Sequence, residues 1–520
     1  MRKTKHLLII ILLSLSAFLI HGYQFAVSDQ EIFITYILKS QDPSLFQSDA
    51  LFNQSSAHLS LFYPVIGFLT KFVDIQVTFV IGYLIFQFAF FVALYRLSRI
   101  LLKDNDLAYF SLLPFLLPKF IGGTAAQTFD LFFGYRSIGV IFLVFYLSFL
   151  LEKKYIKSIF FASVGFLFHP LSIIPNILLL PVLAIQSSKS RVFDSLKYII
   201  LPMVIGLTLF AIFGQSFTNS SPLKDNLWLS IIRFRDDYLF ISSWTLRAWG
   251  AFALYFFLIV IFLKKVQKSL IKPIIIISFV SLILFLINSF VLETLKIPLV
   301  AEFQLVRSIN PIAYIGLALS PLFLVPKNYF QRILGGAAFI FLCLNLFDLF
   351  FATAIIFTFC LLLNRNEEKV KPRVFNPYAI PVITFILYIA LNIPSYLNFQ
   401  EKIQFPKKQD DWINVQKWAS QNTAKSAKFL VPPDQTGFRI FSSRPIVGDI
   451  KDGAVVIYSP QYAIYWSNLM ADTANYQNLE SGDFLALKRK YSFSYFVTTA
   501  LKNLPLEVVF KNNSFIVYKF

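Results

Sequence analysis

Three acidic residues with the chemistry of catalytic groups occur in residues 27–74, a polar segment that follows the first apolar run. Asp29 comes directly after that run, Glu31 follows two residues later, and Asp49 lies further along. Carboxylates at such positions could act as a general base or bind a divalent cation. Asp29 is the strongest candidate because it is closest to the end of the apolar run. Asp49 is also consistent with a helix cap, since QSDALF is typical of a helix start.

Arginines occur in the later polar segments. Arg136 follows Asp130 in TFDLFFGYR, and Arg307 lies in KIPLVAEFQLVRSINP together with Glu302. Guanidinium groups bind phosphate oxygens in a bidentate manner, so this combination of acids and arginines suits a lipid-phosphate substrate. The simpler alternative is that Arg136 pairs with Asp130 and Arg307 pairs with Glu302.

A histidine and a cluster of charges complete the set. His169 precedes Pro170 within a long apolar run and fits the polar tip of a helical hairpin better than a base, although it remains a candidate for substrate binding. The segment 215–247 is rich in charge and contains the residues Arg233, Arg235, Asp236, Asp237 and Arg247.

The composition shows what must position these residues. Of the 520 residues, 57% are hydrophobic and only 14% are charged, whereas soluble proteins carry about 25% charged residues. Lipid must therefore be the solvent for most of the chain. The net charge of +19 is best explained by lysines and arginines in cytoplasmic loops, so we do not expect nucleic acid as a partner.

The apolar runs predict an α-helical polytopic membrane protein with about 13 spans. The runs at 158–186 and 333–363 are too long for one span, and a polar residue interrupts each of them, His169 and Asp348 respectively. Basic residues flank both ends of each run, which favours two hairpins; eleven spans result if each run crosses once. The single spans are expected near residues 7–26, 75–95, 107–121, 137–151, 199–214, 248–263, 272–292, 309–325 and 377–396.

This arrangement places the N-terminus in the cytoplasm and the C-terminus outside it. The polar interruptions then collect on the outer face, and residues 59–73 are predicted to form a helix lying in the membrane interface. Residues 1–396 form the transmembrane domain, and the long first outer loop is 27–74.

Residues 397–520 have the composition of a globular domain, which we expect to be extracytoplasmic and mixed α/β. A helix is predicted after Asp410-Asp411, and further helices near 460–470 and 480–491. AKFLVPP, GFRIF and YFVTT are predicted as strands, and LEVVFKNNSFIVYKF as a hairpin turning at Asn512-Asn513. The domain either caps the membrane part or binds a glycan or lipid head group; the cap is the simpler interpretation.

The layout resembles the GT-C class of integral-membrane glycosyltransferases, and is closest to bacterial members with no assigned function. The resemblance rests on the acid after the first helix in VSDQEIF, on the series Asp29, Asp42-Pro43 and Asp49, and on WA–NT–FLVPP–GFR–RP between Trp418 and Pro445. It implies transfer of a sugar from a polyprenyl-phosphate or polyprenyl-diphosphate carrier to a glycan or other acceptor outside the cytoplasm, at the bacterial cytoplasmic membrane. The expected partners are therefore a lipid-linked sugar, membrane lipid and that acceptor.

The resemblance also implies roles for single residues. Asp29 would activate the acceptor or bind a metal, Asp130 would bind a divalent cation, and Arg307 would hold the lipid phosphate. The chain departs from the class in having a lone Asp130 instead of an acidic pair, and in lacking a WWD-type signature. The lone acid weakens the expectation of metal dependence, and the missing signature weakens the expectation of a protein acceptor.

Three other functions are compatible with the pattern. A transporter or flippase of a lipid-linked glycan predicts two similar halves and charges at the bilayer midplane. The sequence shows neither sign, because its polar residues collect on one face, and this favours an enzyme that works at the membrane surface. A polymerase or ligase of surface polysaccharide predicts a large outer loop late in the membrane part. A non-catalytic assembly protein of the cell envelope predicts that Asp29 is replaceable.

Overall fold

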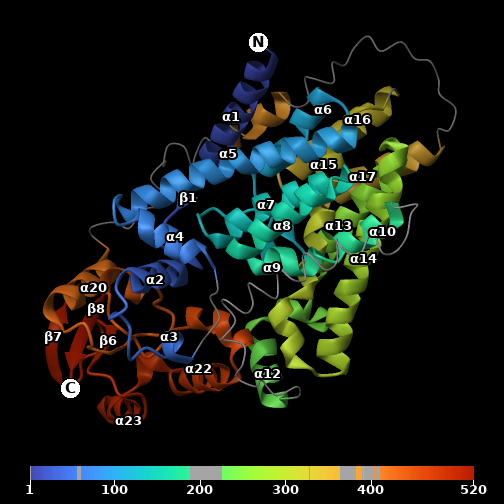
Figure 1. The fold of residues 1–520 in the computed structure, drawn as a ribbon. Coiled ribbons are helices and arrows are strands. Elements are labelled where there is room, and N and C mark those ends of the chain that lie inside the picture. Colours follow the sequence, from blue (N-terminus) through green and yellow to red (C-terminus); the bar gives the residue numbers. More distant parts are fainter. Residues whose placement is uncertain are drawn as a thin grey trace.

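The computed structural model describes residues 2–54, 60–187, 225–326, 328–363, 382–388, 390–391, 403–404 and 410–520. These residues are mostly helical, and a small sheet lies near the C-terminus. The N-terminus and the C-terminal region lie at opposite ends of the molecule (Figure 1). The long helix α5 (Ile75–Leu102) starts at the end of the first loop and runs across the molecule.

Five helical segments are long and apolar enough to cross a membrane, as expected of a helical membrane protein. They include α1 (Arg2–His21), α5 (Ile75–Leu102), α13 (Leu246–Phe262) and α14 (Lys268–Ser289), and the fifth is Pro298–Leu324. Large apolar side chains on these helices are exposed, for example Leu12, Ile85, Val260 and Phe279. Exposed apolar surface on this scale is expected where lipid is the neighbour.

The two long apolar runs are each broken into shorter helices, which confirms the predicted breaks. The first consists of α8 (Tyr155–Phe168), the short α9 (Pro170–Ile173) and η2 (Ile174–Asn176), and α10 (Leu179–Ser187). The second consists of α16 (Tyr329–Cys343) and α17 (Phe347–Leu363), which pack against each other. The turn of the second run precedes Asp348, which lies in the first turn of α17.

The span predicted at 107–121 is wrong. These residues belong to α6 (Asn105–Phe110), η1 (Leu113–Leu116) and β2 (Phe120–Ile121), which pairs with β3 (Ala126–Gln127). Pro114 and Pro118 interrupt helical hydrogen bonding there, so an apolar run of spanning length does not form one helix. The predicted span at 199–214 and most of that at 377–396 lie outside the described residues.

The segment Pro298–Leu324 is irregular although it is apolar. It contains the 3₁₀ turns η7 (Pro298–Phe303) and η8 (Leu305–Ile309), α15 (Asn310–Leu319) and η9 (Ser320–Leu324). Gln304, between η7 and η8, has a left-handed backbone. Most of the segment is buried among the other helices, and irregular backbone at membrane depth is tolerated where protein surrounds it.

The helix α1 ends at His21 and β1 (Tyr23–Gln24) follows it, so the helix is shorter than the predicted span 7–26. The first loop contains α2 (Gln30–Gln41), α3 (Ala50–Gln54) and α4 (Phe62–Leu69). The helix α4 lies within the predicted interfacial helix 59–73 and packs on α2. It and the turn after it expose Val65, Phe68, Leu69 and Phe72. The helix α7 (Tyr135–Leu151) is apolar, covers the predicted span 137–151 and packs against α5 and α8. The remaining elements are α12 (Asn226–Arg235), η3 (Asp237–Leu239), η4 (Ile241–Ser243), η5 (Leu263–Lys265) and the π-helical η6 (Phe290–Thr294).

The C-terminal region is mixed α/β, as predicted. Its four-stranded sheet has the order β5-β6-β8-β7, with β5 parallel to β6 and the other pairs antiparallel. The strands are β5 (Phe429–Leu430), β6 (Tyr495–Thr499), β7 (Glu507–Lys511) and β8 (Phe515–Lys519). The helices are α20 (Asp411–Asn422), α21 (Phe438–Ser442), η10 (Lys451–Tyr458), α22 (Pro460–Asp472), η11 (Tyr476–Asn478) and α23 (Ser481–Tyr491); β4 (Ile403–Gln404) pairs with β1.

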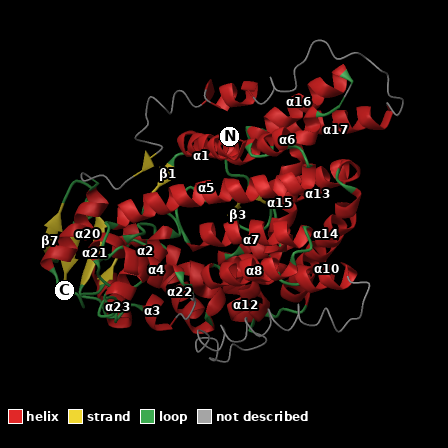
Figure 2. Ribbon diagram, turned by 45° about the horizontal axis from the view of Figure 1, so that its top comes forward, coloured by secondary structure: helices red, strands yellow, loops and turns green. Residues whose placement is uncertain are grey.

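One prediction for this region is wrong. GFRIF forms the helical turn α21 and not a strand, because left-handed residues bound it on both sides, Gly437 and Ser443. The C-terminal region packs against α2, α3 and α12 through α21, α22 and η10, and these elements lie together away from the N-terminus (Figures 1 and 2). In this way the first loop and the C-terminal region meet at Asp29 and Asp49, which pair with Lys451 and Arg439 respectively.

Candidate functional site

The backbone before α2 is fixed in an unusual conformation. Ala26 and Ser28 have positive φ angles of 60° and 53°, which cost energy for residues other than glycine. Gln30 stabilises this turn, because its Oε1 accepts a hydrogen bond from the Ala26 amide at 2.8 Å and its Nε2 donates to the Phe133 carbonyl at 2.9 Å. Asp29, at the start of α2, is thereby held next to the loop that precedes α7.

Asp29 lies among cations from three other elements. Lys451 Nζ is 2.7 Å from Asp29 Oδ1, and Arg136 and Arg307 also act on this carboxylate electrostatically. Burial raises the pKa of Asp29, but the attraction of Lys451, Arg136 and Arg307 outweighs burial and lowers the pKa below its usual range. Asp29 is therefore an ionised carboxylate at neutral pH.

Arg136 and Asp130 form an ion pair, as the simpler alternative predicted. Arg136 Nε donates to Asp130 Oδ2 at 2.7 Å, and Arg136 Nη2 donates to Asp130 Oδ1. Both carboxylate oxygens are thus engaged by one guanidinium. Within the described part of the chain, no three His, Cys, Asp or Glu side chains lie together as metal ligands; metal binding by Asp130 stays a prediction.

Arg307 is a buried arginine in a different situation. Its side chain is only 8% exposed, Nη1 is 3.5 Å from His169 Nε2, and the Tyr238 hydroxyl is within hydrogen-bonding reach. Among the described residues it forms no ion pair with Glu302 or any other carboxylate, and its Nε has no hydrogen-bond partner. A buried guanidinium without a carboxylate partner among the described residues is unfavourable, so this group is suited to an incoming anion.

His169 is buried between helices. Its Nδ1 is 2.6 Å from Ser172 Oγ, and its ring packs 4.9 Å from that of Tyr135. Burial, Arg307 and Arg136 lower the pKa of His169 well below its usual range, so the imidazole is neutral. With Nδ1 facing Ser172, Nε2 is the nitrogen that faces Arg307.

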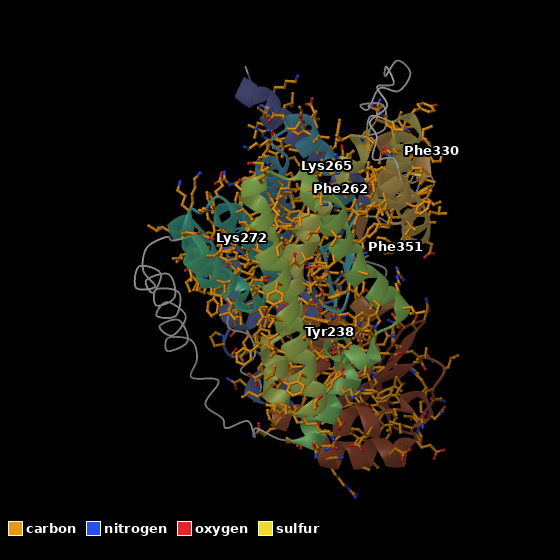
Figure 3. All side chains as sticks on the ribbon, turned by 90° about the vertical axis from the view of Figure 1, so that its right-hand side faces the viewer. Tyr238, Phe262, Lys265, Lys272, Phe330 and Phe351 are labelled. Atoms are coloured by element: carbon orange, nitrogen blue, oxygen red, sulfur yellow. The ribbon has the colours of Figure 1, made fainter. Side chains whose placement is uncertain are left out.

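The structure adds to this site residues that the sequence did not single out as catalytic or binding groups. Asp236, just before η3, is 7% exposed and its Oδ2 has no partner among the described residues; burial raises its pKa to about 7 despite Arg235 and Arg307. Tyr238 and Tyr458 lie in the electrostatic field of Arg307 and Asp236, and Tyr238 lies toward the C-terminal region in Figure 3. We call the following set the polar cluster: Asp29, Asp130, Arg136, His169, Asp236, Tyr238, Arg307, Lys451 and Tyr458.

Glu31 faces the C-terminal region. It packs on Gly437, where an added Cβ would lie 3.5 Å from Glu31 carbon atoms, an ordinary van der Waals distance. The left-handed φ of +77° at Gly437 disfavours any other residue there. Thr436 is within hydrogen-bonding reach of Glu31, but Glu31 Oε2 has no partner among the described residues. Burial raises the pKa of Glu31 to about 7, although Thr436 and Lys451 act in the opposite direction.

The raised pKa of Glu31 predicts a pH-dependent stability. In the unfolded chain Glu31 ionises near its ordinary pKa of 4.5. Because the pKa of Glu31 is higher in the folded state, its contribution to the unfolding free energy is complete below pH 4.5 and is lost as the pH rises toward 7. We expect wild-type protein to lose about 1–3 kcal/mol of unfolding free energy over this interval from Glu31. Denaturant unfolding at pH 5 and pH 7.5 should show that Glu31→Gln is less sensitive to pH than wild type or the exposed Glu507→Gln. Equal pH sensitivity in all three proteins would contradict this.

Asp49 has a structural role. Its carboxylate is fully buried and accepts hydrogen bonds from Arg439 Nε at 2.8 Å and Arg439 Nη2 at 3.0 Å. The amides of Leu51 and Ile446 also donate to it, and Arg439 bonds to Asp452 at 2.8 and 2.7 Å. With these four donors on its carboxylate, Asp49 joins the first loop to the C-terminal region. Its assignment as a catalytic residue stays a prediction that this arrangement does not favour. We call this the Asp49–Arg439–Asp452 latch.

Comparison with known protein families shows a match in the C-terminal region. The model of a domain of unknown function, DUF6798, matches residues 410–472. A search of curated proteins found no match. The matched residues include Gly437, Arg439, Lys451, Asp452 and Tyr458, so they cover the part of the C-terminal region that contacts Glu31, Asp49 and Asp29.

Proposed function

We propose that this protein is a membrane glycosyltransferase of the GT-C type that takes its sugar from a polyprenyl-phosphate carrier. It would work on the outer face of a bacterial cytoplasmic membrane, with the N-terminus inside and the C-terminal domain outside. The observation that carries the proposal is the buried Arg307 guanidinium, which has no carboxylate partner among the described residues and shares a cluster with the ionised Asp29.

The charge of a polyprenyl-phosphate carrier is complementary to that of Arg307. A sugar linked through one phosphate is a phosphodiester with one negative charge. Arg307 offers a positive charge that forms no ion pair with a carboxylate among the described residues, and a fork of donors. The segment that holds Arg307, Pro298–Leu324, is itself long and apolar enough to cross a membrane. A polyprenyl chain in lipid with its phosphate at Arg307 is compatible with this position. His169 and Tyr238 contact Arg307 and would fix the plane of its guanidinium.

Asp29 supplies the second function. An acceptor hydroxyl oxygen would attack the anomeric carbon, and Asp29 would take the hydroxyl proton. The bond between that carbon and the phosphate oxygen would break, and the electron pair would leave with polyprenyl phosphate. The additional negative charge on the leaving phosphate would form beside Arg307, which favours the transition state over the bound donor.

The test is donor turnover by purified protein in detergent or membranes. Wild type, Asp29→Asn and the control Asp42→Asn would each be given polyprenyl-phosphate and polyprenyl-diphosphate sugars, with loss of lipid-linked sugar as the readout. We expect turnover by wild type, a reduction of about 10²–10⁴-fold in Asp29→Asn, and near-normal turnover in Asp42→Asn. Asp42 is a suitable control because it is an exposed acid of the same loop, paired with Lys425.

Two outcomes would overturn the proposal. Full activity of Asp29→Asn would remove Asp29 from the reaction. Absence of turnover on every donor, with equal binding of donor by wild type and variant, would move the assignment to a transporter, a flippase or an assembly protein.

A further inference from the structure

Lys451 connects the C-terminal region to Asp29. It belongs to η10, more than 400 residues from Asp29 in the sequence, and its Nζ lies 2.7 Å from Asp29 Oδ1. The same ammonium is 3.5 Å from Ser28 Oγ, the residue whose left-handed backbone precedes Asp29. Lys451 therefore contacts both the turn and the carboxylate that the turn presents.

Several interactions hold Lys451 in this place. The Asp449 carboxylate accepts hydrogen bonds from the backbone amides of Lys451 at 2.9 Å and of Asp452 at 3.1 Å. Trp466 Nε1 donates to the Asp449 carbonyl at 3.0 Å, and Asp452 belongs to the Asp49–Arg439–Asp452 latch. The position of the Lys451 backbone is thus set by buried contacts on both sides.

We propose that Lys451 is a positioning residue that the C-terminal region supplies to the site, where its ammonium orients the Asp29 carboxylate. This inference rests on the proposed function for its effect on turnover. It changes the interpretation of the C-terminal region: this part of the chain completes the site and is more than a cap over the membrane part. Lys451 is one of the residues 410–472 that the family of unknown function matches, so the inference assigns a role to one matched residue.

Other charged groups also act on Asp29 and limit how strongly the loss of Lys451 changes its ionisation. Arg136 at the start of α7 and Arg307 in η8 stabilise its ionised form. Asp29 also acts on Glu31, Asp236, Tyr63 and Tyr135, which are its titratable neighbours on α2, before η3, on α4 and on α7. The side chains of Lys451 and Asp29 are 21% and 36% exposed, so water moderates their attraction. Losing Lys451 therefore weakens the stabilisation of the ionised carboxylate without removing it.

The experiment compares Lys451→Met with Lys451→Arg and with Lys425→Met. Lys425 is a matched control because it also joins the C-terminal region to an acid of the first loop, Asp42, at 2.9 Å, but in an exposed pair. We expect Lys451→Met to lower kcat about tenfold with an unchanged KM for the donor, and to shift the acid limb of the pH–rate profile to higher pH. Lys451→Arg should restore most of the activity, and Lys425→Met should resemble wild type.

A second readout does not depend on turnover. Infrared difference spectroscopy follows carboxyl protonation, and the Asp29→Asn variant identifies the Asp29 band. We expect this band to titrate at higher pH in Lys451→Met than in wild type or Lys425→Met. An unshifted band would overturn the inference even if the protein is a glycosyltransferase. A shifted band together with no turnover on any donor would overturn the proposed function alone.

Discussion

Replacing Arg439 with methionine should lower the unfolding free energy by about 3–5 kcal/mol, the cost of breaking a buried ion pair by removing one partner. The side chains of Arg439, Asp49 and Asp452 are almost completely buried. Without Arg439, two carboxylates face each other in a site closed to water, next to Asp449, whose burial already raises its pKa. Methionine fills much of the arginine volume, so the loss reports the charge and not a cavity.

The measurement is denaturant or thermal unfolding in detergent, combined with limited proteolysis between the membrane part and residue 410. The control is Lys425→Met, which breaks the exposed Asp42–Lys425 pair between the same two parts of the chain. We expect a change below about 0.5 kcal/mol for this control. Equal stability of the two variants would show that the latch does not hold the C-terminal region in place.

Replacing Arg307 with methionine should weaken the binding of polyprenyl phosphate by about 10–150-fold, since a charge-assisted hydrogen bond contributes about 1.5–3 kcal/mol. The same change should leave the stability of the ligand-free protein unchanged or raise it. The reason is that a buried guanidinium without a carboxylate partner is costly in the absence of an anion. This opposite effect on binding and on stability is typical of a residue retained for function.

Binding is measured by displacement of a fluorescent polyprenyl phosphate, and stability by thermal unfolding without ligand. Arg233→Met is the control, because Arg233 comes from a nearby polar segment but donates to Ser242 and stacks on Phe240. We expect Arg233→Met to bind like wild type. If Arg307→Met unfolds at much lower temperature and binds normally, Arg307 is a structural residue with a partner that forms only in the membrane.

The effects predicted for Glu31, Lys451 and Arg439 share one physical origin. Each depends on contact between the first loop and the C-terminal region, through Gly437, Asp29 and Asp49 respectively. A change in that contact would therefore alter the orientation of the Asp29 carboxylate. Variants of Arg439 are expected to lose activity in proportion to the fraction of molecules in which the C-terminal region is detached.

The sequence by itself determined the features that depend on neighbouring residues. Apolar runs predicted the long helices, and His169-Pro170 predicted the break after α8. Asp410 predicted the start of α20, where its carboxylate accepts hydrogen bonds from Trp412 and Ile413. The hairpin of β7 and β8 was confirmed by the same kind of local pattern. These signals are local because helix caps, prolines and strand alternation act within a few residues.

The sequence also singled out Asp29, Asp130, Arg136, His169 and Arg307, because charges that interrupt apolar runs are rare. Only the tertiary structure decided how they are used. It paired Arg136 with Asp130, left Arg307 without a carboxylate among the described residues, and joined Asp49 to Arg439 across 390 positions of sequence. It also made GFRIF a helical turn and brought Lys451 to Asp29. The physical reason is that a buried charge is stabilised by the partner that folding brings within about 3 Å of it, and no spacing along the chain encodes that partner.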